Sequence, residues 1–188
     1  MKSAKIIDNM IIIACLEYIK CINIFESCNG NYHMATSDIV YNEFAQKARP
    51  QDVEVFNKFF TVHNLSQDPK YRELFEYVTN RYNKLHRGEL SSFLVMVLEY
   101  LVKNKNCYYV TDDQTAKKVF TNIHNDKIFM KLLGSSIEPP KVTGLVGLVK
   151  HLREKGLLPK GYPKAIKTDL KDNGYFLSED LLKILYTI

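Results

Sequence analysis

Short apolar runs alternate with longer segments of helical periodicity along most of the chain. The pattern predicts strands at residues 5–7, 32–36, 59–63 and 108–111, and helices at 10–25, 37–48, 53–58, 68–84, 89–102, 114–133, 143–155 and 178–186. Asn29-Gly30-Asn31 is typical of a turn, and Ser37 and Thr143 are each predicted to cap the helix that follows. Strands that alternate with helices predict an α/β fold, a three-layer α/β/α arrangement with a central parallel sheet.

The length of 188 residues fits one compact domain. We predict a single domain over 1–188, with a helical extension around 50–87 and a C-terminal helical tail over 156–188. Hydrophobic residues make up 46% and charged residues 25%, as in ordinary soluble proteins. No run approaches the roughly 20 apolar residues that a membrane span needs.

The distribution of charge indicates a class of substrate, and the cysteine content indicates a cellular compartment. Residues 1–113 hold 13 Lys and Arg against 14 Asp and Glu, a net of −1, whereas residues 114–188 hold 13 against 7, a net of +6. An anionic substrate such as a nucleic-acid backbone suits this division, although many proteins with a net charge of +5 bind no nucleic acid. Cys15, Cys21, Cys28 and Cys107 show neither a CxxC pair nor zinc-ligand spacing, so we expect reduced thiols in a cytoplasmic protein.

Five acidic residues stand out by position. Asp112 and Asp113 directly follow the predicted strand at 108–111, and the carboxyl end of a central strand is where open α/β sheets bind ligands. Asp8 follows the strand at 5–7, and this strand is expected to lie beside the strand at 108–111. Glu43 lies on the inward face of its predicted helix, and Glu89 occupies the first turn of the most regular helix. The five acids are therefore expected to meet.

Each acid also has an ordinary structural explanation. Asp8 and one of the two aspartates at 112–113 suit helix N-caps, Glu43 suits a solvated helix face, and Glu89 suits the positive end of a helix dipole. Carboxylates that converge without a local cation repel one another unless a divalent metal neutralises them. All-oxygen ligation suits Mg²⁺ or Mn²⁺, and such ions activate water for phosphodiester cleavage. The arrangement therefore favours a metal-dependent nuclease.

Four short segments also occur in an informative order: Ile6-Ile7-Asp8-Asn9-Met10, Val40-Tyr41-Asn42-Glu43, Gly88-Glu89-Leu90-Ser91-Ser92 and Val110-Thr111-Asp112-Asp113-Gln114-Thr115-Ala116. Their order and spacing resemble the PIN-domain family, most closely its VapC-like prokaryotic branch with a Gly-Glu third site. Segments 142–148 and 174–182 resemble the C-terminal part of that branch. The resemblance therefore covers nearly the whole chain.

The resemblance implies a PIN-like fold and a Mg²⁺- or Mn²⁺-dependent endoribonuclease acting on single-stranded or structured RNA. The implied catalytic and metal-binding residues are Asp8, Glu43, Glu89, Asp112 and Asp113. Relatives that carry one aspartate after the threonine match Asp113, so we expect Asp113 to be the main ligand and Asp112 to be second. No Ser/His/Asp or Cys/His arrangement points to a side-chain nucleophile.

Asn9, Thr111 and Thr143 are candidates to support the site. Thr111 and Thr143 resemble polar residues near the family's site. Relatives usually place Thr or Ser directly after the first aspartate, where a hydroxyl assists. Asn9 stands there in this chain, and although it can donate a hydrogen bond, its support of a metal is in question.

The chain is longer than a minimal PIN domain, chiefly between residues 49 and 87. This region interleaves basic and aromatic side chains: Lys70, Arg72, Arg81, Lys84 and Arg87 with Tyr71, Tyr77 and Tyr82. Such a pattern suits RNA binding through phosphate contacts and stacking. A solvated helix face packed by its own aromatics is the simpler explanation.

Relatives in toxin–antitoxin modules imply that the protein forms a homodimer and binds a small antitoxin protein. The alternative function is a PIN fold that binds RNA or a protein without cutting. A phosphoryl-accepting aspartate domain is disfavoured, because Asp8-Asn9-Met10 lacks the second acid of an Asp-x-Asp motif.

Overall fold

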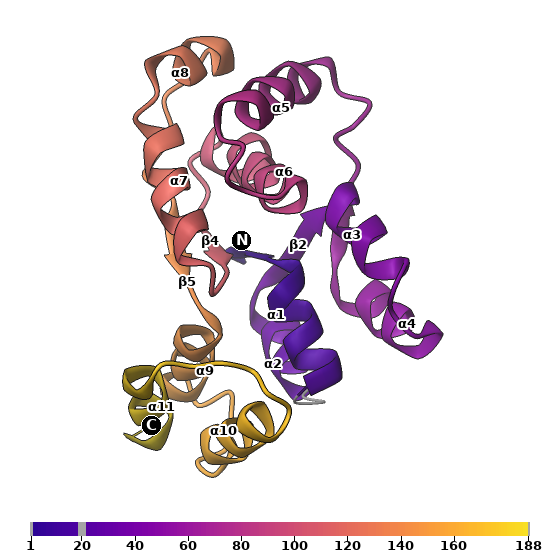
Figure 1. Cartoon of the computed structure of the whole chain (residues 1–188), viewed down its shortest axis with the longest axis vertical. Coiled ribbons are helices and arrows are strands. Elements are labelled where there is room, and N and C mark those ends of the chain that lie inside the picture. The colour runs from indigo at the N-terminus through magenta and orange to yellow at the C-terminus, as the bar shows by residue number, and fades with distance from the viewer. Residues whose placement is uncertain (1, 19–21, 188) are drawn as a thin grey trace.

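The computed structural model describes residues 2–18 and 22–187, and within them a single parallel sheet lies between layers of helices (Figure 1). The strand order is β3-β2-β1-β4-β5. The strands are β1 (Ala4–Ile7), β2 (His33–Ser37), β3 (Thr61–His63), β4 (Cys107–Val110) and β5 (Lys141–Thr143). The predicted three-layer α/β/α fold with a central parallel sheet is therefore confirmed.

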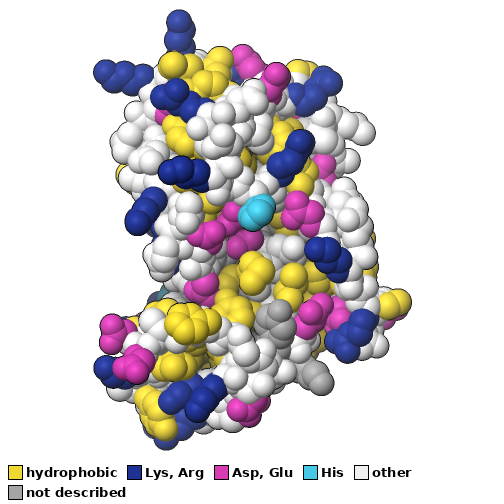
Figure 2. Space-filling view, in the orientation of Figure 1, with side chains coloured by type: hydrophobic (Ala, Val, Ile, Leu, Met, Phe, Trp, Pro, Cys, Tyr) yellow, Lys and Arg dark blue, Asp and Glu magenta, His cyan; other side chains and the backbone are white. Residues whose placement is uncertain are grey.

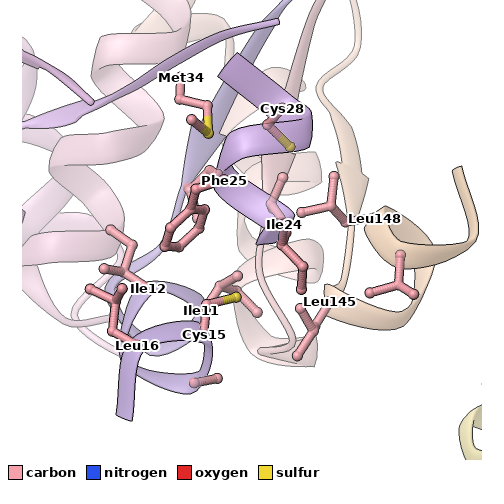
Figure 3. Close-up of a cluster of buried hydrophobic side chains, with 14 of the residues drawn as sticks. Ile11, Ile12, Cys15, Leu16, Ile24, Phe25, Cys28, Met34, Leu145 and Leu148 are labelled. Atoms are coloured by element: carbon pink, nitrogen blue, oxygen red, sulfur yellow. The ribbon is translucent and has the colours of Figure 1, made fainter. Parts of the chain in front are cut away.

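Alternating side chains along the strands supply two hydrophobic cores, one on each face of the sheet. Ile7 of β1 and Val110 of β4 belong to one core, whereas Ile6 and Tyr109 belong to the other. Figure 3 shows part of the first core, where Phe25 packs among residues of the N-terminal helices and of the helix that follows β5. The central strands β1 and β4 are thus covered on both sides, which their apolar sequences require.

Two sets of helices cover these cores. The first core is covered by α1 (Asn9–Ile13), the π-helical turn η1 (Ala14–Tyr18), α2 (Ile22–Asn31), α4 (Pro50–Phe59), α9 (Leu145–Glu154), α10 (Tyr162–Asp172) and α11 (Glu179–Thr187). The second is covered by α5 (Pro69–Arg81), α6 (Arg87–Met96), the π-helical turn η2 (Val97–Leu101), α7 (Gln114–His124) and α8 (Lys127–Leu133). None of the described helices is long and apolar enough to cross a membrane.

Helix α3 (Asp38–Ala45) begins where β2 ends. As the sequence predicts, Ser37 caps this helix, and its Oγ accepts a hydrogen bond of 3.1 Å from the backbone N–H of Val40. Ser37 Oγ also lies 2.6 Å from Ser91 Oγ on α6, and both hydroxyls are buried. This contact fixes the start of α3 against the start of α6, and each of these helices carries one of the candidate acids.

Three predictions about local structure were wrong. The predicted cap Thr143 instead ends β5, a three-residue strand with too few apolar residues to be read as one, and Gly144 is the N-cap of α9. The predicted helix at 114–133 is two helices, because Asn125 ends α7 and Asp126 caps α8. The turn predicted at 29–31 is helical, since these exposed polar residues continue α2.

Two further predictions fall partly outside the described residues. The helix expected at 10–25 contains residues 19–21, and on either side of them the chain is helical or π-helical. Cys21 lies in the same segment. Cys28 and Cys107 are buried free thiols, and burial raises the pKa of each to about 12, which makes them poor nucleophiles at neutral pH.

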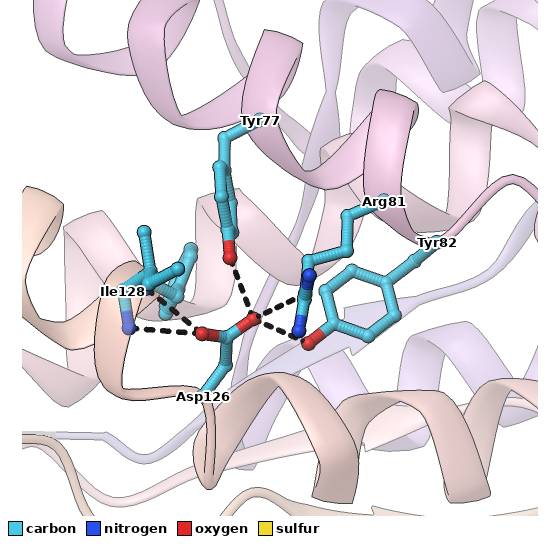
Figure 4. Close-up of polar contacts among 6 residues, drawn as sticks. Tyr77, Arg81, Tyr82, Asp126 and Ile128 are labelled. Atoms are coloured by element: carbon cyan, nitrogen blue, oxygen red, sulfur yellow. Dashed lines mark hydrogen bonds and ion pairs between the residues drawn. The ribbon is translucent and has the colours of Figure 1, made fainter.

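The tyrosines of the basic extension are used to pack α5 against the rest of the protein. Tyr71 is buried in the core. Figure 4 shows the second contact, where the Asp126 carboxylate accepts hydrogen bonds from the hydroxyls of Tyr77 (2.8 Å) and Tyr82 (2.7 Å) and pairs with Arg81 Nε at 2.9 Å. These three tyrosines therefore pack within the protein, as in the simpler explanation of the basic and aromatic pattern, and do not form a free surface for stacking on RNA bases.

Candidate active site

The acids converge because β1 and β4 are neighbours. The two strands pair in parallel with Ile7 opposite Val110, so Asp8 and Asp112 leave the sheet at the same edge, as the sequence predicts. A pocket of about 650 Å³ lies there, and all five candidate carboxylates line it. Its described lining is Asp8, Asn9, Met10, Glu43, His86, Gly88, Glu89, Asp112, Asp113, Asn173, Gly174, Tyr175 and Phe176.

The face of the molecule shown in Figure 2 is hollowed near its middle. Acidic side chains gather there around a histidine, and hydrophobic side chains adjoin them on the side of the C-terminal helices. The lining has the same two parts, with carboxylates from the sheet edge, α3 and α6, and apolar groups from Met10 and the segment after α10. The hollow therefore offers a charged wall and an apolar wall.

Asp8 is buried, with 4% of its surface exposed. Its Oδ2 accepts a hydrogen bond of 2.8 Å from the hydroxyl of Thr111, and that hydroxyl oxygen accepts one of 3.1 Å from the backbone N–H of Asp113. Although Asp8 stands at the N-cap of α1, its side chain makes no capping hydrogen bond. Burial raises the pKa of Asp8 to about 6, and the nearby charge of Asp113 adds a smaller effect. The cap explanation therefore does not account for this carboxylate.

Glu89 is the second buried acid, with 8% of its surface exposed. Its Oε2 accepts a hydrogen bond of 3.1 Å from the backbone N–H of His86, the residue before α6, so the carboxylate helps to begin that helix. Burial raises the pKa of Glu89 to about 7, and the charges of Asp8 and Asp113 add to the effect. The charges of Asp8 and Asp113 raise the pKa of Glu89, and the charge of Asp113 raises the pKa of Asp8, so both buried acids lie in a region of negative potential.

Gly88 allows Glu43 to approach α6. A Cβ at Gly88 would lie 2.7 Å from Glu43 Oε2, closer than real Cβ atoms come to a neighbour. The Gly-Glu pair at 88–89 therefore has a physical role: the glycine makes room for one acid and the glutamate supplies another. Gly144 has a similar position beside Asp112, since a Cβ there would collide with Asp112 Oδ1.

Asp112 and Asp113 differ in how much of each carboxylate the protein itself uses. Asp112 Oδ1 accepts from the backbone N–H of Leu145 at 3.1 Å, and its Oδ2 accepts from the hydroxyl of Tyr175 at 2.8 Å. Asp113 Oδ1 accepts from the first-turn N–H groups of α7, and its charge reaches Glu89. Both oxygens of Asp112 are thus engaged. The expectation that Asp113 is the main ligand stays a prediction, and this difference is in line with it.

The supporting residues fall into different places. Thr111 is fully buried and orients Asp8, and Asn9 lines the pocket. Thr143 ends the neighbouring strand β5, where its carbonyl accepts a hydrogen bond of 2.8 Å from the backbone N–H of Thr111. It thereby holds β4 in place and is not among the described residues that line the pocket.

Sequence reasoning missed three parts of the lining. Met10 lies two residues after Asp8 and His86 just before α6, and no sequence pattern points to either as part of a site. The segment Asn173–Phe176 lies far from the acids in sequence and returns to them because α10 packs near η1. Its one local signal was the Asn-Gly turn followed by two aromatic residues.

The donor chemistry fits a hard divalent cation. No Lys or Arg is found among the described residues that line the pocket, and Asn9 Oδ1 is buried with no hydrogen-bond partner in the described chain. Carboxylate and amide oxygens are the ligands that Mg²⁺ and Mn²⁺ take. Within residues 2–18 and 22–187, however, no three His, Cys, Asp or Glu side chains are already gathered as a metal would need. Direct ligation of one cation by three of these side chains would need them to rotate.

No protein-family model matches the chain, and no curated protein or solved structure does either. The resemblance to PIN domains accordingly remains a prediction from the sequence. The pocket itself supplies the physical argument about function.

Proposed function

We propose that this protein is a Mg²⁺- or Mn²⁺-dependent endoribonuclease. The observation that carries the proposal is the convergence of five carboxylates, from four separate segments of the chain, on one pocket at the carboxyl edge of the sheet. Burying like charges together is unfavourable unless a cation compensates them. In its described lining, this pocket contains no Lys or Arg that could do so.

Asp8, Glu89 and Asp113 would hold the cation, with Glu43 and Asp112 at the edge of the same site. A bound divalent cation would neutralise charge on a phosphodiester and lower the pKa of a water molecule. Thr111 keeps Asp8 aimed into the pocket, and Gly88 leaves Glu43 the space to face it. In the overall reaction water adds to phosphorus, and the bond from phosphorus to the leaving oxygen breaks.

The test is cleavage of a labelled RNA with Mg²⁺ or Mn²⁺, with EDTA as the matched negative condition. The wild-type protein should give products that EDTA abolishes. Asp8→Asn and Asp113→Asn should each remove this activity while leaving the circular dichroism spectrum unchanged. Full metal-stimulated activity in both variants would sink the assignment.

A binding module without catalysis is the second candidate, and one observation favours it. Both oxygens of Asp112 and one of Asp113 already accept hydrogen bonds that stabilise the fold, so these acids have structural roles of their own. Such a module would bind RNA or a protein equally well with and without the metal. The cleavage assay, repeated as a binding assay in EDTA, separates the two functions.

The toxin role, the homodimer and the small antitoxin partner rest on the resemblance to VapC-like PIN domains. A short antitoxin-like reading frame next to the coding region would support that part of the proposal. Size-exclusion chromatography with light scattering tests the homodimer independently.

A further inference from the structure

Phe176 is the most exposed of the large hydrophobic side chains in the described chain, with 90% of its surface accessible. Its neighbours on both sides are anchored. The Tyr175 hydroxyl donates to Asp112 Oδ2, the Tyr175 N–H donates to the carbonyl of Leu170 at 2.8 Å, and Leu177 is 8% exposed and packs in the first core. The aromatic ring is therefore held in solvent by a backbone that is fixed on either side.

A glycine makes this presentation possible. Gly174 follows α10 with a φ of +73°, a left-handed conformation that residues with a side chain rarely adopt. The chain turns there and brings Tyr175 and Phe176 to the carboxylates. Alternation then places Tyr175 and Leu177 inward and Phe176 outward.

Phe176 faces the same pocket as the acids. Met10, which is 53% exposed, lines this pocket as well, so two of the exposed large hydrophobic side chains meet the carboxylate site. The others in the described residues are not part of the lining: Ile128 on α8, and Ile184 and Tyr186 on α11. An exposed apolar side chain is ordinary by itself, but an anchored one on the wall of a candidate active site needs an explanation.

We propose that Phe176, with Met10 on the same wall, is a stacking subsite for an unpaired nucleobase next to the scissile phosphate. This inference rests on the proposed ribonuclease function and names the part of the substrate that the apolar wall would bind. A nucleotide has an anionic phosphate at one end and an apolar aromatic base at the other, and the pocket has a metal-binding wall and an apolar wall to match. Aromatic side chains stack on unpaired bases without requiring a particular sequence.

The first test is steady-state kinetics on a short single-stranded oligoribonucleotide. Phe176→Ala should raise KM about ten-fold, because one lost stack typically weakens binding by this much, and should change kcat by less than about two-fold. Phe176→Trp keeps an aromatic face and should retain the wild-type KM. Tyr186→Ala is the matched control, since it removes an exposed aromatic that is not among the described residues lining the pocket, and it should leave both constants unchanged.

A second substrate identifies the base as the group that stacks. An oligoribonucleotide with one abasic position beside the cleaved bond should raise KM for the wild type about as much as Phe176→Ala does. The same substrate should give Phe176→Ala no additional penalty, since the interaction is already lost. Additive penalties, or an unchanged KM in Phe176→Ala, would overturn the stacking subsite while leaving the ribonuclease assignment intact.

A binding measurement without cleavage tests the stacking subsite independently of the ribonuclease function. Fluorescence anisotropy of a labelled oligoribonucleotide, recorded with Asp8→Asn and with the Asp8→Asn, Phe176→Ala double variant, should show about ten-fold weaker binding by the double variant. If the wild type cuts no RNA with any divalent metal, the ribonuclease assignment fails, and this comparison still decides the subsite. Equal affinities refute the subsite. So does a change of oligomeric state in Phe176→Ala with unaltered RNA affinity, which would assign the ring to a protein contact.

Discussion

The Thr111 hydroxyl donates a 2.8 Å hydrogen bond to Asp8 Oδ2 and so joins the ends of the two central strands, β4 and β1. The same oxygen accepts from the N–H of Asp113, so one hydroxyl orients acids on both strands. Both partners are buried: Thr111 has no exposed surface, and Asp8 has 4% of its surface exposed. The position of Asp8 in the pocket therefore depends on a residue that does not itself line the pocket.

Thr111→Val replaces this hydroxyl with a methyl group of similar volume. A buried carboxylate and a backbone N–H each lose a partner, so we expect the free energy of unfolding to fall by about 1–3 kcal/mol and metal affinity to weaken. Urea denaturation and calorimetric Mn²⁺ titration measure the two effects. Thr111→Ser, which keeps the hydroxyl, is the control and should retain metal affinity. Equal affinity in the valine variant would show that the hydrogen bond does not orient Asp8.

Asp8→Asn should stabilise the metal-free protein at neutral pH. The pKa of Asp8 is raised from 3.8 to about 6, so the native state holds more protons than the unfolded state between about pH 4 and 6, and stability falls as pH rises through that window. Replacing the charge removes a cost of roughly 1–3 kcal/mol above pH 6. The measurement is the difference in unfolding free energy between variant and wild type from pH 4 to 8 in EDTA. That difference should grow with pH, and a flat or negative difference contradicts the prediction.

The adjacency of β1 and β4 and the meeting of the acids could be predicted because both follow from local patterns. Each of β1 and β4 is a short apolar run that ends in an aspartate, and parallel neighbours place such ends at one edge. Ser37 could be recognised as a cap because capping depends on neighbouring residues alone. Glu43 and Glu89 could be placed because helical periodicity assigns each a face.

The features that could not be predicted from the sequence depend on contacts between residues distant in the chain. β5 has three residues, and its place in the sheet comes from pairing with β4, which no local pattern encodes. The division between α7 and α8 is fixed by Asp126, which binds the tyrosines of α5 as well as its own helix. Phe176 lines the pocket because α10, which is far from Asp8 in sequence, packs against η1.

Substitution of Asp126 tests how the extension around 50–87 packs on the protein, independently of the acidic pocket. Its folded pKa is lowered to about 2: burial alone would raise it, but hydrogen bonds from Tyr82, Tyr77 and backbone N–H groups outweigh that effect. Its contribution is therefore fully present above its unfolded pKa near 4 and is lost as pH falls toward 2. Asp126→Asn should cost about 1–2 kcal/mol at pH 7, because charge-assisted hydrogen bonds from the half-buried Tyr77 and Tyr82 and the ion pair with exposed Arg81 are weakened.

The control for this prediction is Asp180→Asn on α11. Asp180 is 91% exposed and pairs with exposed Lys183 at 3.6 Å, so its loss should change stability by less than about 0.5 kcal/mol. Denaturation at pH 7 and at pH 2.5 should show a cost for Asp126→Asn that shrinks in acid. A cost that is the same at both values would mean that charge is not the cause.

Gly88→Ala tests the space that Glu43 occupies. The new Cβ would lie 2.7 Å from Glu43 Oε2, and the end of that flexible side chain can move, so the fold should survive with little change in melting temperature. The displaced carboxylate should lower RNA cleavage by about ten-fold, since small misplacements of catalytic groups are costly. Gly161→Ala is the matched control, because a Cβ there meets nothing within 4 Å. Wild-type cleavage by Gly88→Ala would exclude Glu43 from the site.

The most direct measurement is the melting temperature during a Mn²⁺ titration at pH 7.5, for the wild type and for Asp8→Asn, with Asp180→Asn as the charge-matched control away from the pocket. Metal that binds the native state stabilises it by about 2.7 kcal/mol at one hundred times the dissociation constant. A divalent-cation site built from these carboxylates predicts a saturable rise in the wild type and in Asp180→Asn, and little or none in Asp8→Asn. The same rise in all three proteins, or none in any of them, would contradict it.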